Sequence, residues 1–325
     1  MAKFKRLAYV LLSGMMASCT VTPKAKFTIL DFSASDHPRI FGEGVVPIGF
    51  HIRDFTLSPL GNEFFFSVQH QRGYAFILGS KLKNGKWSLP EIASFSGNFT
   101  DFEPSFSPDG KRLYFASNRP NSVDDTKSDF DIWFVEKSAD GWGAPVNLGA
   151  PVNTESNEFF PSISKSGNIY FTGVYKTGMG RDDIYMSQLI NGKYEQPTLL
   201  DSAINSRNSE FNAFVGPNED YIIFTAWGRP DEKGGGDLYI SHRTNEGKWL
   251  PAKNMGDKIN SPYLDYCPFV DPTNANLFFT SNRFNSDHFL NKSLTWEEFK
   301  KLLSSSANGN GSLYIINYSS ATEIK

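Results

Sequence analysis

Residues 103–119 read EPSFSPDGKRLYFASNR. A short segment ending at Phe106 is followed by the turn Pro108-Asp109-Gly110 and by an apolar run through Phe115. Pro presets φ and Gly tolerates positive φ, so these residues suit a tight turn. The stretch therefore predicts two antiparallel strands joined by a hairpin.

The same layout recurs five times along the chain. Each unit has an apolar strand, a turn and a second apolar strand ending in an aromatic residue. These aromatic residues recur every 49 to 56 residues, at Phe66, Phe115, Phe171, Phe224 and Phe279. A third strand recurs at Ala75-Phe76, Ile132-Trp133, Ile184-Tyr185, Leu238-Tyr239 and Leu313-Tyr314, and a fourth opens near Trp87, Trp142, Tyr194 and Trp249. Four strands per period of about fifty residues are typical of β-propeller blades.

The fifth unit lacks a fourth strand of its own. The segment His37–Gly42 (HPRIFG) has the character of Ala144–Gly149 (APVNLG), which precedes the third unit. A strand from the start of the chain would complete the last blade and remove an open sheet edge. We therefore expect an all-β fold, a single five-bladed propeller of four-stranded blades closed by an N-terminal strand, with one short helix inserted in the last blade.

Residues 103–119 also closely resemble the WD-like repeat of TolB-type propellers, and similar repeats form the propellers of tricorn and dipeptidyl-peptidase proteins. The resemblance covers roughly residues 37–318. It implies a propeller of the bacterial envelope, with a six-bladed TolB-like ring as the alternative. It says little about activity, because propellers host many functions.

The N-terminus has the pattern of a secretion signal. Lys3, Lys5 and Arg6 precede the apolar run 7–16, which is too short to span a membrane comfortably. The sequence Met-Ala-Ser-Cys ending at Cys19 resembles a bacterial lipobox, in which the Cys is lipidated and becomes the first mature residue. The alternative is an ordinary cleavable signal.

These features divide the chain into three parts. We expect a signal peptide at residues 1–18, a tether at 19–36 and the propeller at 37–320. Thr20 follows Cys19 where an inner-membrane retention signal would have Asp. By resemblance to lipoprotein sorting signals, this favours the outer membrane, facing the periplasm. Lipid at Cys19 would anchor the protein to the membrane.

Composition excludes several classes of function. The chain has 325 residues and a net charge of −3, without the basic footprint of a nucleic-acid-binding protein. The sequence contains no Gly-x-Ser-x-Gly elbow, no His-Glu-x-x-His motif and no Gly-Lys-Ser/Thr phosphate loop. Its five His residues show no ligand spacing. We expect a monomer with no metal, no cofactor and no nucleic-acid partner.

The connections between strands differ in length. Turns such as Asn191-Gly192 are short, whereas the connections between second and third strands are long, and the last of them runs from Phe284 to Gly311. Long, variable loops on a rigid scaffold are where binding usually occurs. We therefore expect the binding site on the long-loop face and little concavity on the short-turn face.

A helix is predicted inside the last long connection. Thr295 and Glu298 have the spacing of a capping box. Trp296, Phe299 and the leucines at 302 and 303 then share one apolar face. Two interpretations stay open: the helix packs on the propeller rim, or it covers the channel mouth or docks a partner.

Charged residues recur at matching positions of the units. Acids precede the innermost strands at Asp101, Glu158, Glu210 and Asp265, arginines follow the second strands at Arg119, Arg229 and Arg283, and only two units carry the column Asp54/Glu103. Repeated acids commonly cap turns or pair with a neighbouring blade. The functional alternative is an acidic, Arg-flanked funnel for a cation, a sugar or a peptide terminus. The candidate ligand-binding residues are therefore Asp101, Glu103, Glu158, Glu210, Asp265, Arg119, Arg229, Arg283, Trp296 and Phe299.

Two functions from different classes fit these observations. The first is a non-catalytic lipoprotein that uses a propeller face to bind an envelope protein, peptide or glycan. The second is a propeller glycosidase or polysaccharide lyase with carboxylates on the axis, which needs an acid and a base or nucleophile at a defined separation. A unique chemistry needs residues that break the repeat, and only the Asp54/Glu103 column does so. We therefore expect the binding function and no enzyme activity.

Overall fold

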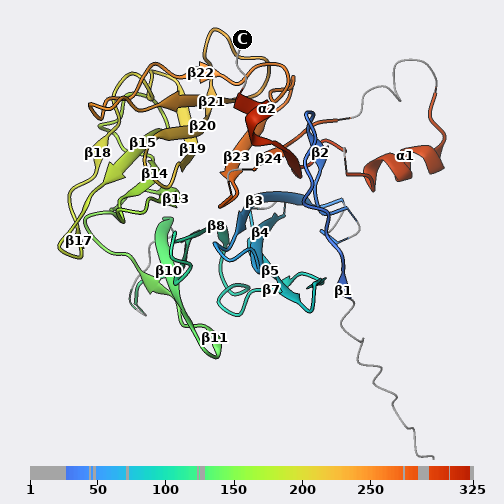
Figure 1. Ribbon diagram of the computed structural model, residues 1–325, viewed down its shortest axis with the longest axis horizontal. Helices are drawn as coiled ribbons and strands as arrows, with labels where there is room; N and C mark the ends of the chain where they lie inside the picture. The colour runs from blue at the N-terminus through green and yellow to red at the C-terminus, as the bar shows by residue number, and fades with distance from the viewer. Residues whose placement is uncertain are drawn as a thin grey trace, which may run out of the picture.

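The computed structural model describes residues 27–43, 45–46, 49–70, 73–122, 124, 129–273, 275–284, 293–306 and 308–322. Five antiparallel sheets are arranged around a central axis, in chain order from blue to red (Figure 1). The signal peptide and Cys19 lie outside the described residues. No helix among the described residues is long and apolar enough to cross a membrane.

Each of the five blades starts with its innermost strand. Blade one contains β3 (His51–Leu57), β4 (Glu63–Gln69), β5 (Ala75–Lys83) and β7 (Glu91–Ile92), and blade two contains β8 (Asp101–Phe106), β9 (Arg112–Ser117), β10 (Asp131–Ser138) and β12 (Val146–Asn147). Blade three contains β13 (Glu158–Ile163), β14 (Ile169–Gly173), β15 (Asp183–Ser187) and β18 (Thr198–Leu199), and blade four contains β19 (Ser209–Val215), β20 (Tyr221–Trp227), β21 (Asp237–His242) and β22 (Lys253–Asn254). Blade five contains β23 (Asp265–Val270), β24 (Asn276–Ser281), β25 (Ser312–Asn317) and β2 (Arg39–Ile40). The expected five-bladed architecture is confirmed.

The chain start closes the ring as expected. Strand β2 pairs antiparallel with β25, with Ile40 opposite Tyr314. Phe41 follows, is 1% exposed and packs among residues of blades one and five, including Phe55 and Phe278. Burial of a Phe side chain contributes about 1.5–3 kcal/mol, so this segment both covers a sheet edge and fills the junction between the first and last blades.

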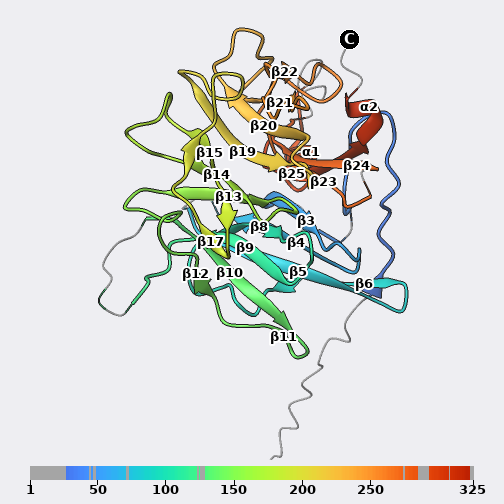
Figure 2. The same ribbon diagram turned by 60° about the vertical axis from the view of Figure 1, so that its left-hand side comes forward.

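Part of the predicted tether lies against the propeller. Strand β1 (Phe27–Thr28) pairs with β6 (Lys86–Ser88), which belongs to a hairpin at the outer end of β5. The Phe32 ring lies 5.0 Å from that of Phe41 and 5.6 Å from that of Trp87. The N-terminal chain thus runs from β6 to the edge of blade five (Figure 2).

Similar hairpin extensions lengthen the outer parts of blades two and three. Strand β11 (Gly141–Trp142) pairs with the end of β10, and β16 (Leu189–Ile190) pairs with β17 (Lys193–Tyr194). Between the blades, the repeated aromatic residues form the core: Phe66, Phe115, Phe171, Phe224 and Phe279 are all 0% exposed. Each blade therefore buries its sheet faces against its neighbours, which explains why the aromatic period is so visible in the sequence.

The helix in the last connection is present and has the predicted cap. Helix α1 (Trp296–Leu303) begins after Thr295, whose side chain accepts from the Glu298 amide, and the Glu298 carboxylate accepts from the Thr295 amide. It lies outside the ring, away from the inner strands (Figure 1). Trp296 is 65% exposed, and of the helix residues only Leu302 is buried. A second short helix, α2 (Tyr318–Thr322), was not expected from the sequence and follows β25.

Candidate functional site

Every innermost strand contains a bulge at the same position. The register shifts within β3, β8, β13, β19 and β23, and in each a non-glycine residue has positive φ: Asp54, Glu103, Phe160, Asn212 and Cys267. Such backbone conformations are uncommon for these residue types, and bulges redirect side chains. The five residues occupy equivalent positions around the axis, and we call them the axial ring.

Hydrogen bonds link the axial ring across the channel. The Asn212 Nδ2 atom donates to Glu103 Oε1 at 3.0 Å, although these residues belong to blades four and two. The Phe160 amide donates to Glu103 Oε2 at 2.7 Å, and the Glu103 amide donates to Asp54 Oδ2 at 3.2 Å. The Cys267 thiol donates to Asn212 Oδ1 at 3.4 Å, and burial raises its pKa, so it stays protonated. The propeller axis is therefore filled by a polar network.

Arg53 lies at the centre of this network. Its Nε atom donates to Asp54 Oδ1 at 2.7 Å and its Nη2 atom donates to Glu103 Oε1 at 2.6 Å. The Arg53 guanidinium also donates to Gln69, the last residue of β4. Gln69 lies at the end of β4, on the face where the second strand of each blade connects to the third, so Arg53 occupies the long-loop end of the axis.

The two axial carboxylates are both buried and fully engaged. Asp54 is 2% exposed and Glu103 is 3% exposed. Burial raises the pKa of Glu103, while the positive charge of Arg53 opposes that rise. A void lined by residues that include Asp54 and Glu103 has a volume of about 20 Å³. That is room for one water molecule and not for a sugar ring.

Aromatic side chains surround Arg53 at the channel mouth. The residue before the axial-ring position is aromatic in four blades, and we call these four the collar: Phe102, Phe159, Phe211 and Tyr266. The fifth blade has Arg53 there, and its guanidinium lies 5.3 Å from the Phe102 ring and 5.2 Å from the Tyr266 ring. The Phe102 and Phe159 rings lie 5.9 Å apart, and Phe130, which follows a long loop, contacts both.

His51 fixes the position of Tyr266 in the collar. The Gly311 amide donates to His51 Nδ1 at 3.1 Å, so the neutral ring carries its proton on Nε2 and donates it to the Tyr266 hydroxyl, 2.6 Å away. Burial, with the nearby charge of Arg53, lowers the pKa of His51 to about 4. The imidazole is therefore neutral at physiological pH.

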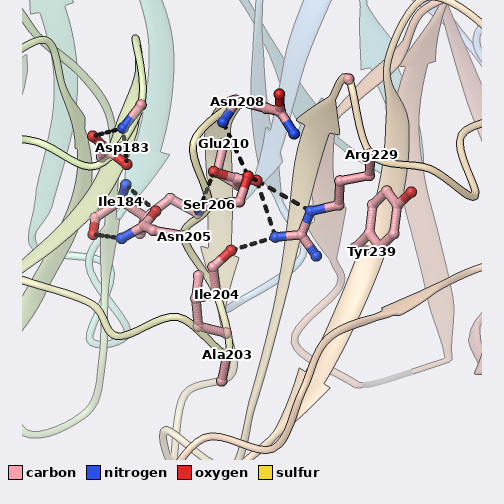
Figure 3. Close-up of polar contacts among 12 residues, drawn as sticks. Asp183, Ile184, Ala203, Ile204, Asn205, Ser206, Asn208, Glu210, Arg229 and Tyr239 are labelled. Atoms are coloured by element: carbon pink, nitrogen blue, oxygen red, sulfur yellow. Dashed lines mark hydrogen bonds and ion pairs between the residues drawn. The ribbon is translucent and has the colours of Figure 1, made fainter.

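The acids expected just before the inner strands are the first or second residues of those strands, and they lie inside the blades. Asp101, Glu158, Glu210 and Asp265 are each 0% exposed, so the expected open acidic funnel is not formed. In blade four, Glu210 accepts from the Ser206 hydroxyl at 2.7 Å and from Arg229 at 3.0 Å (Figure 3). The prediction that these acids occupy equivalent positions of the repeat was correct. Each carboxylate, however, is buried within its own blade. Ligand contact by these four residues stays a prediction.

The arginines pair with these acids in three blades. Arg119 lies 2.6 Å from Asp101, Arg229 3.0 Å from Glu210 and Arg283 3.3 Å from Asp265. Each guanidinium also donates to a backbone carbonyl of the preceding connection, at Phe95, Ile204 and Ile259, and lies over aromatic rings of its own blade. These pairs fasten the connection between blades to the inner strand, as Figure 3 shows for Arg229.

Blade three departs from this arrangement. Glu158 accepts from Thr154 at 2.7 Å, and Tyr175 occupies the place that the arginine has in blades two, four and five. Without a cationic partner, burial raises the pKa of Glu158 to about 7. This carboxyl group therefore titrates near neutral pH.

Sequence reasoning missed several members of the axial site. Asp54 and Glu103 were singled out, but Arg53, Asn212 and Cys267 were not. The signal was present for Arg53, since it replaces an aromatic residue at one position of a fivefold repeat. The two remaining candidates, Trp296 and Phe299, lie on α1, outside the ring and away from the inner strands that carry the axial site.

The short-turn face is less flat than expected. A groove of about 1070 Å³ lies between blades two and three, lined by turn residues such as Asp109 and Lys165. The expectation of little concavity there is wrong, because the β16–β17 hairpin extends the wall of the groove. Among the residues that the structure describes, no group of three His, Cys, Asp or Glu side chains is placed to hold a metal ion.

Solved structures of two glycoside hydrolases share this fold. A thermostable family-43 glycoside hydrolase superposes with a TM-score of 0.52 and 13% identity, covering 83% of this chain and 91% of that one. The catalytic domain of the GH62 α-L-arabinofuranosidase of Coprinopsis cinerea gives a TM-score of 0.50 and 11% identity, covering 90% and 96%. The putative TolB of Agrobacterium tumefaciens gives a TM-score of 0.48 and 16% identity, covering 82% and 90%. No family model and no curated protein matches the sequence.

Proposed function

We propose that this chain is a non-catalytic, lipid-anchored envelope protein whose long-loop face binds a protein, peptide or glycan partner around the collar. The observation that carries the proposal is the ion pairing of Arg53 with both axial carboxylates. The half-buried rings of Phe102, Phe159 and Phe211 offer apolar contact area beside this locked centre. Aromatic residues at the centre of a contact surface commonly dominate binding energy.

The state of the carboxylates favours binding over catalysis. A glycosidase needs two carboxyl groups that reach opposite sides of the scissile bond. Here Glu103 accepts from three groups of the protein, and Asp54 accepts from Arg53 and the Glu103 amide. A substrate would have to displace a buried guanidinium before either acid could act.

The cellular location in this proposal rests on the sequence. The lipobox-like segment would give an anchor at Cys19, and Thr20 after it favours the outer membrane. Because β1 and Phe32 pack on the propeller, only residues 20–26 separate Cys19 from the folded part. In this proposal, the propeller therefore lies close to the periplasmic surface of that membrane.

Site-specific photo-crosslinking in cells tests the binding face. A photoreactive amino acid replaces Phe159 or Phe211 in the collar, and a matched control replaces Glu246, which is exposed on a short turn of blade four. We expect the collar positions to capture a shared partner that the control position does not. Capture from Glu246 alone would contradict the proposed face.

A glycosidase or lyase is the second candidate, and one observation favours it. Burial raises the pKa of Glu103, as a general acid requires. This function demands that Arg53 moves away when substrate enters. Release of reducing ends from arabinan, xylan or pectin by the wild-type protein, abolished in Glu103→Gln, would support the enzyme and contradict the non-catalytic proposal.

A further inference from the structure

The groove on the short-turn face has walls from two neighbouring blades. The turn after β8 and the ends of β9 and β10 form one wall, and the turn after β13 with the β16–β17 hairpin forms the other. The connection from β12 to β13, through Leu148 and Pro151, also lines it. Its volume of about 1070 Å³ is at the upper end of what small-ligand sites enclose, about 300–1,000 Å³. We call it the basic groove.

Positive charge is concentrated in the basic groove, although the whole chain is acidic. Its lining contains five cationic side chains, Lys111, Arg112, Lys137, Lys165 and Lys193, and two acidic ones, Asp109 and Glu136. Arg112 pairs with Glu136 at 2.7 Å, and Lys137 pairs with the buried Glu63 at 2.7 Å. These two cations are therefore committed within the protein.

The other three cations are exposed and can pair with carboxylates of a ligand. Lys165 donates to the neutral Asn218 side chain at 3.3 Å, and Lys193 is exposed beside the turn glycine Gly192. Lys111 is 81% exposed and lies 3.9 Å from Asp109. Because Lys111 belongs to blade two and Lys165 and Lys193 belong to blade three, ammonium groups stand on both walls of the groove.

The lining between these charges is mainly aliphatic. Leu148, Pro151 and Leu189 are half-buried in it, and Ile163 is 8% exposed. Two tyrosines also line the groove, but Tyr114 is only 3% exposed and Tyr194 is half-buried, so neither ring offers a fully open face to stack on a sugar. Sugar-binding surfaces rely on such faces, whereas separated lysines and aliphatic side chains suit a peptide carrying both acidic and apolar residues.

We propose that the basic groove binds an extended acidic peptide segment with interspersed apolar side chains. Carboxylates of the segment pair with Lys111, Lys165 and Lys193, and its apolar side chains contact Leu148 and Leu189. The groove lies on the face opposite the collar, so this site is distinct from the proposed function. A protein with both sites can hold two partners at once.

Fluorescence anisotropy with the full-length protein in detergent tests the proposal. The labelled probe is a synthetic peptide of alternating Glu and Leu, and its partner probe carries Gln in place of Glu. The groove variant is Lys165→Glu with Lys193→Glu. The matched control is Lys86→Glu with Lys253→Glu, two exposed lysines that do not line the groove and that change net charge equally.

We expect the Glu/Leu peptide to bind at about 150 mM salt, where long-range charge effects are screened. The groove variant should bind it at least about tenfold more weakly, and the control within about twofold. The Gln/Leu peptide should bind more weakly than the Glu/Leu peptide. Melting temperatures confirm folding, and Lys193→Glu alone, at an exposed position of β17, replaces the double variant if that one unfolds.

Three results would overturn the proposal. The first is absence of peptide binding by the wild-type protein. The second is equal weakening in the groove and control variants, which would indicate a response to net charge only. The third is tighter binding of oligogalacturonate than of the peptide, which would assign the groove to an acidic glycan.

Discussion

Arg53 Nη2 lies 2.6 Å from Glu103 Oε1, and this ion pair joins blades one and two at the propeller axis. Both groups are enclosed by residues of blades four and five, through Asn212 and Cys267. A buried charge that loses its partner is costly, because water cannot replace the lost interaction. The pair therefore stabilises the centre of the ring. It also engages a carboxylate that a substrate at the axis would need to be free.

Arg53→Met should strongly destabilise the protein. It leaves Asp54 and Glu103 buried without their cation, which costs about 3–5 kcal/mol of unfolding free energy in comparable cases. The matched control is Arg112→Met, because Arg112 pairs with Glu136 at a similar 2.7 Å but on the surface. Surface pairs contribute about 0–1 kcal/mol. Urea unfolding measures both, and equal losses would contradict a structural role for the axial pair.

Truncation of the chain start should open the ring. Deleting the mature chain through Gly42 removes β2 and Phe41, exposing the β25 edge and the core between the first and last blades. We expect aggregation and a lower melting temperature. A shorter deletion of residues 20–26 serves as the control. A monomeric truncated protein with an unchanged melting temperature would show that the closing strand is dispensable.

Glu158 should make stability depend on pH. Burial raises its pKa from 4.5 to about 7, so the folded protein binds a proton more tightly than the unfolded chain does. Stability therefore falls as pH rises from about 4.5 to about 7, by on the order of 3 kcal/mol from this group. Glu158→Gln should flatten that fall, whereas the exposed-residue control Glu246→Gln should not. Parallel curves for wild type and Glu158→Gln would refute the assignment.

Cys19 should carry the lipid, and the chain provides its own control. The sequence has two Cys residues, and Cys267 is buried at the axis. Cys19→Ala should abolish lipidation and release the protein from the outer-membrane fraction. Cys267→Ala should retain both. Intact-mass analysis decides, and wild-type protein without a diacylglycerol group would contradict the anchor.

The repeats made the architecture predictable. The aromatic period set the number of blades, and the resemblance of His37–Gly42 to a fourth strand predicted the pairing of Ile40 with Tyr314. The helix cap formed by Thr295 and Glu298 joins residues close together in the sequence, and it was also predicted. Each of these signals depends on neighbouring residues or on a motif that recurs along the chain.

The axial site was less predictable, because its contacts join distant residues. Arg53 meets Cys267 only after five blades have closed, and the bulges that turn these side chains have no marker such as glycine. The basic groove depends on how the β16–β17 hairpin leaves blade three. The acids predicted to line an open funnel are instead buried in pairs such as Glu210 with Arg229. Their burial also depends on the closed ring, so the sequence did not reveal it.

The affinity of the crosslinked partner for collar variants tests the central proposal most directly. Phe159→Ala and Phe211→Ala are compared with Leu60→Ala, an apolar truncation at an 83% exposed position on the short-turn side of blade one. Central aromatic contacts typically contribute about 2 kcal/mol or more, so each collar variant should bind at least about tenfold more weakly. Leu60→Ala should bind like the wild type. Unchanged affinity in both collar variants would contradict binding at the long-loop face.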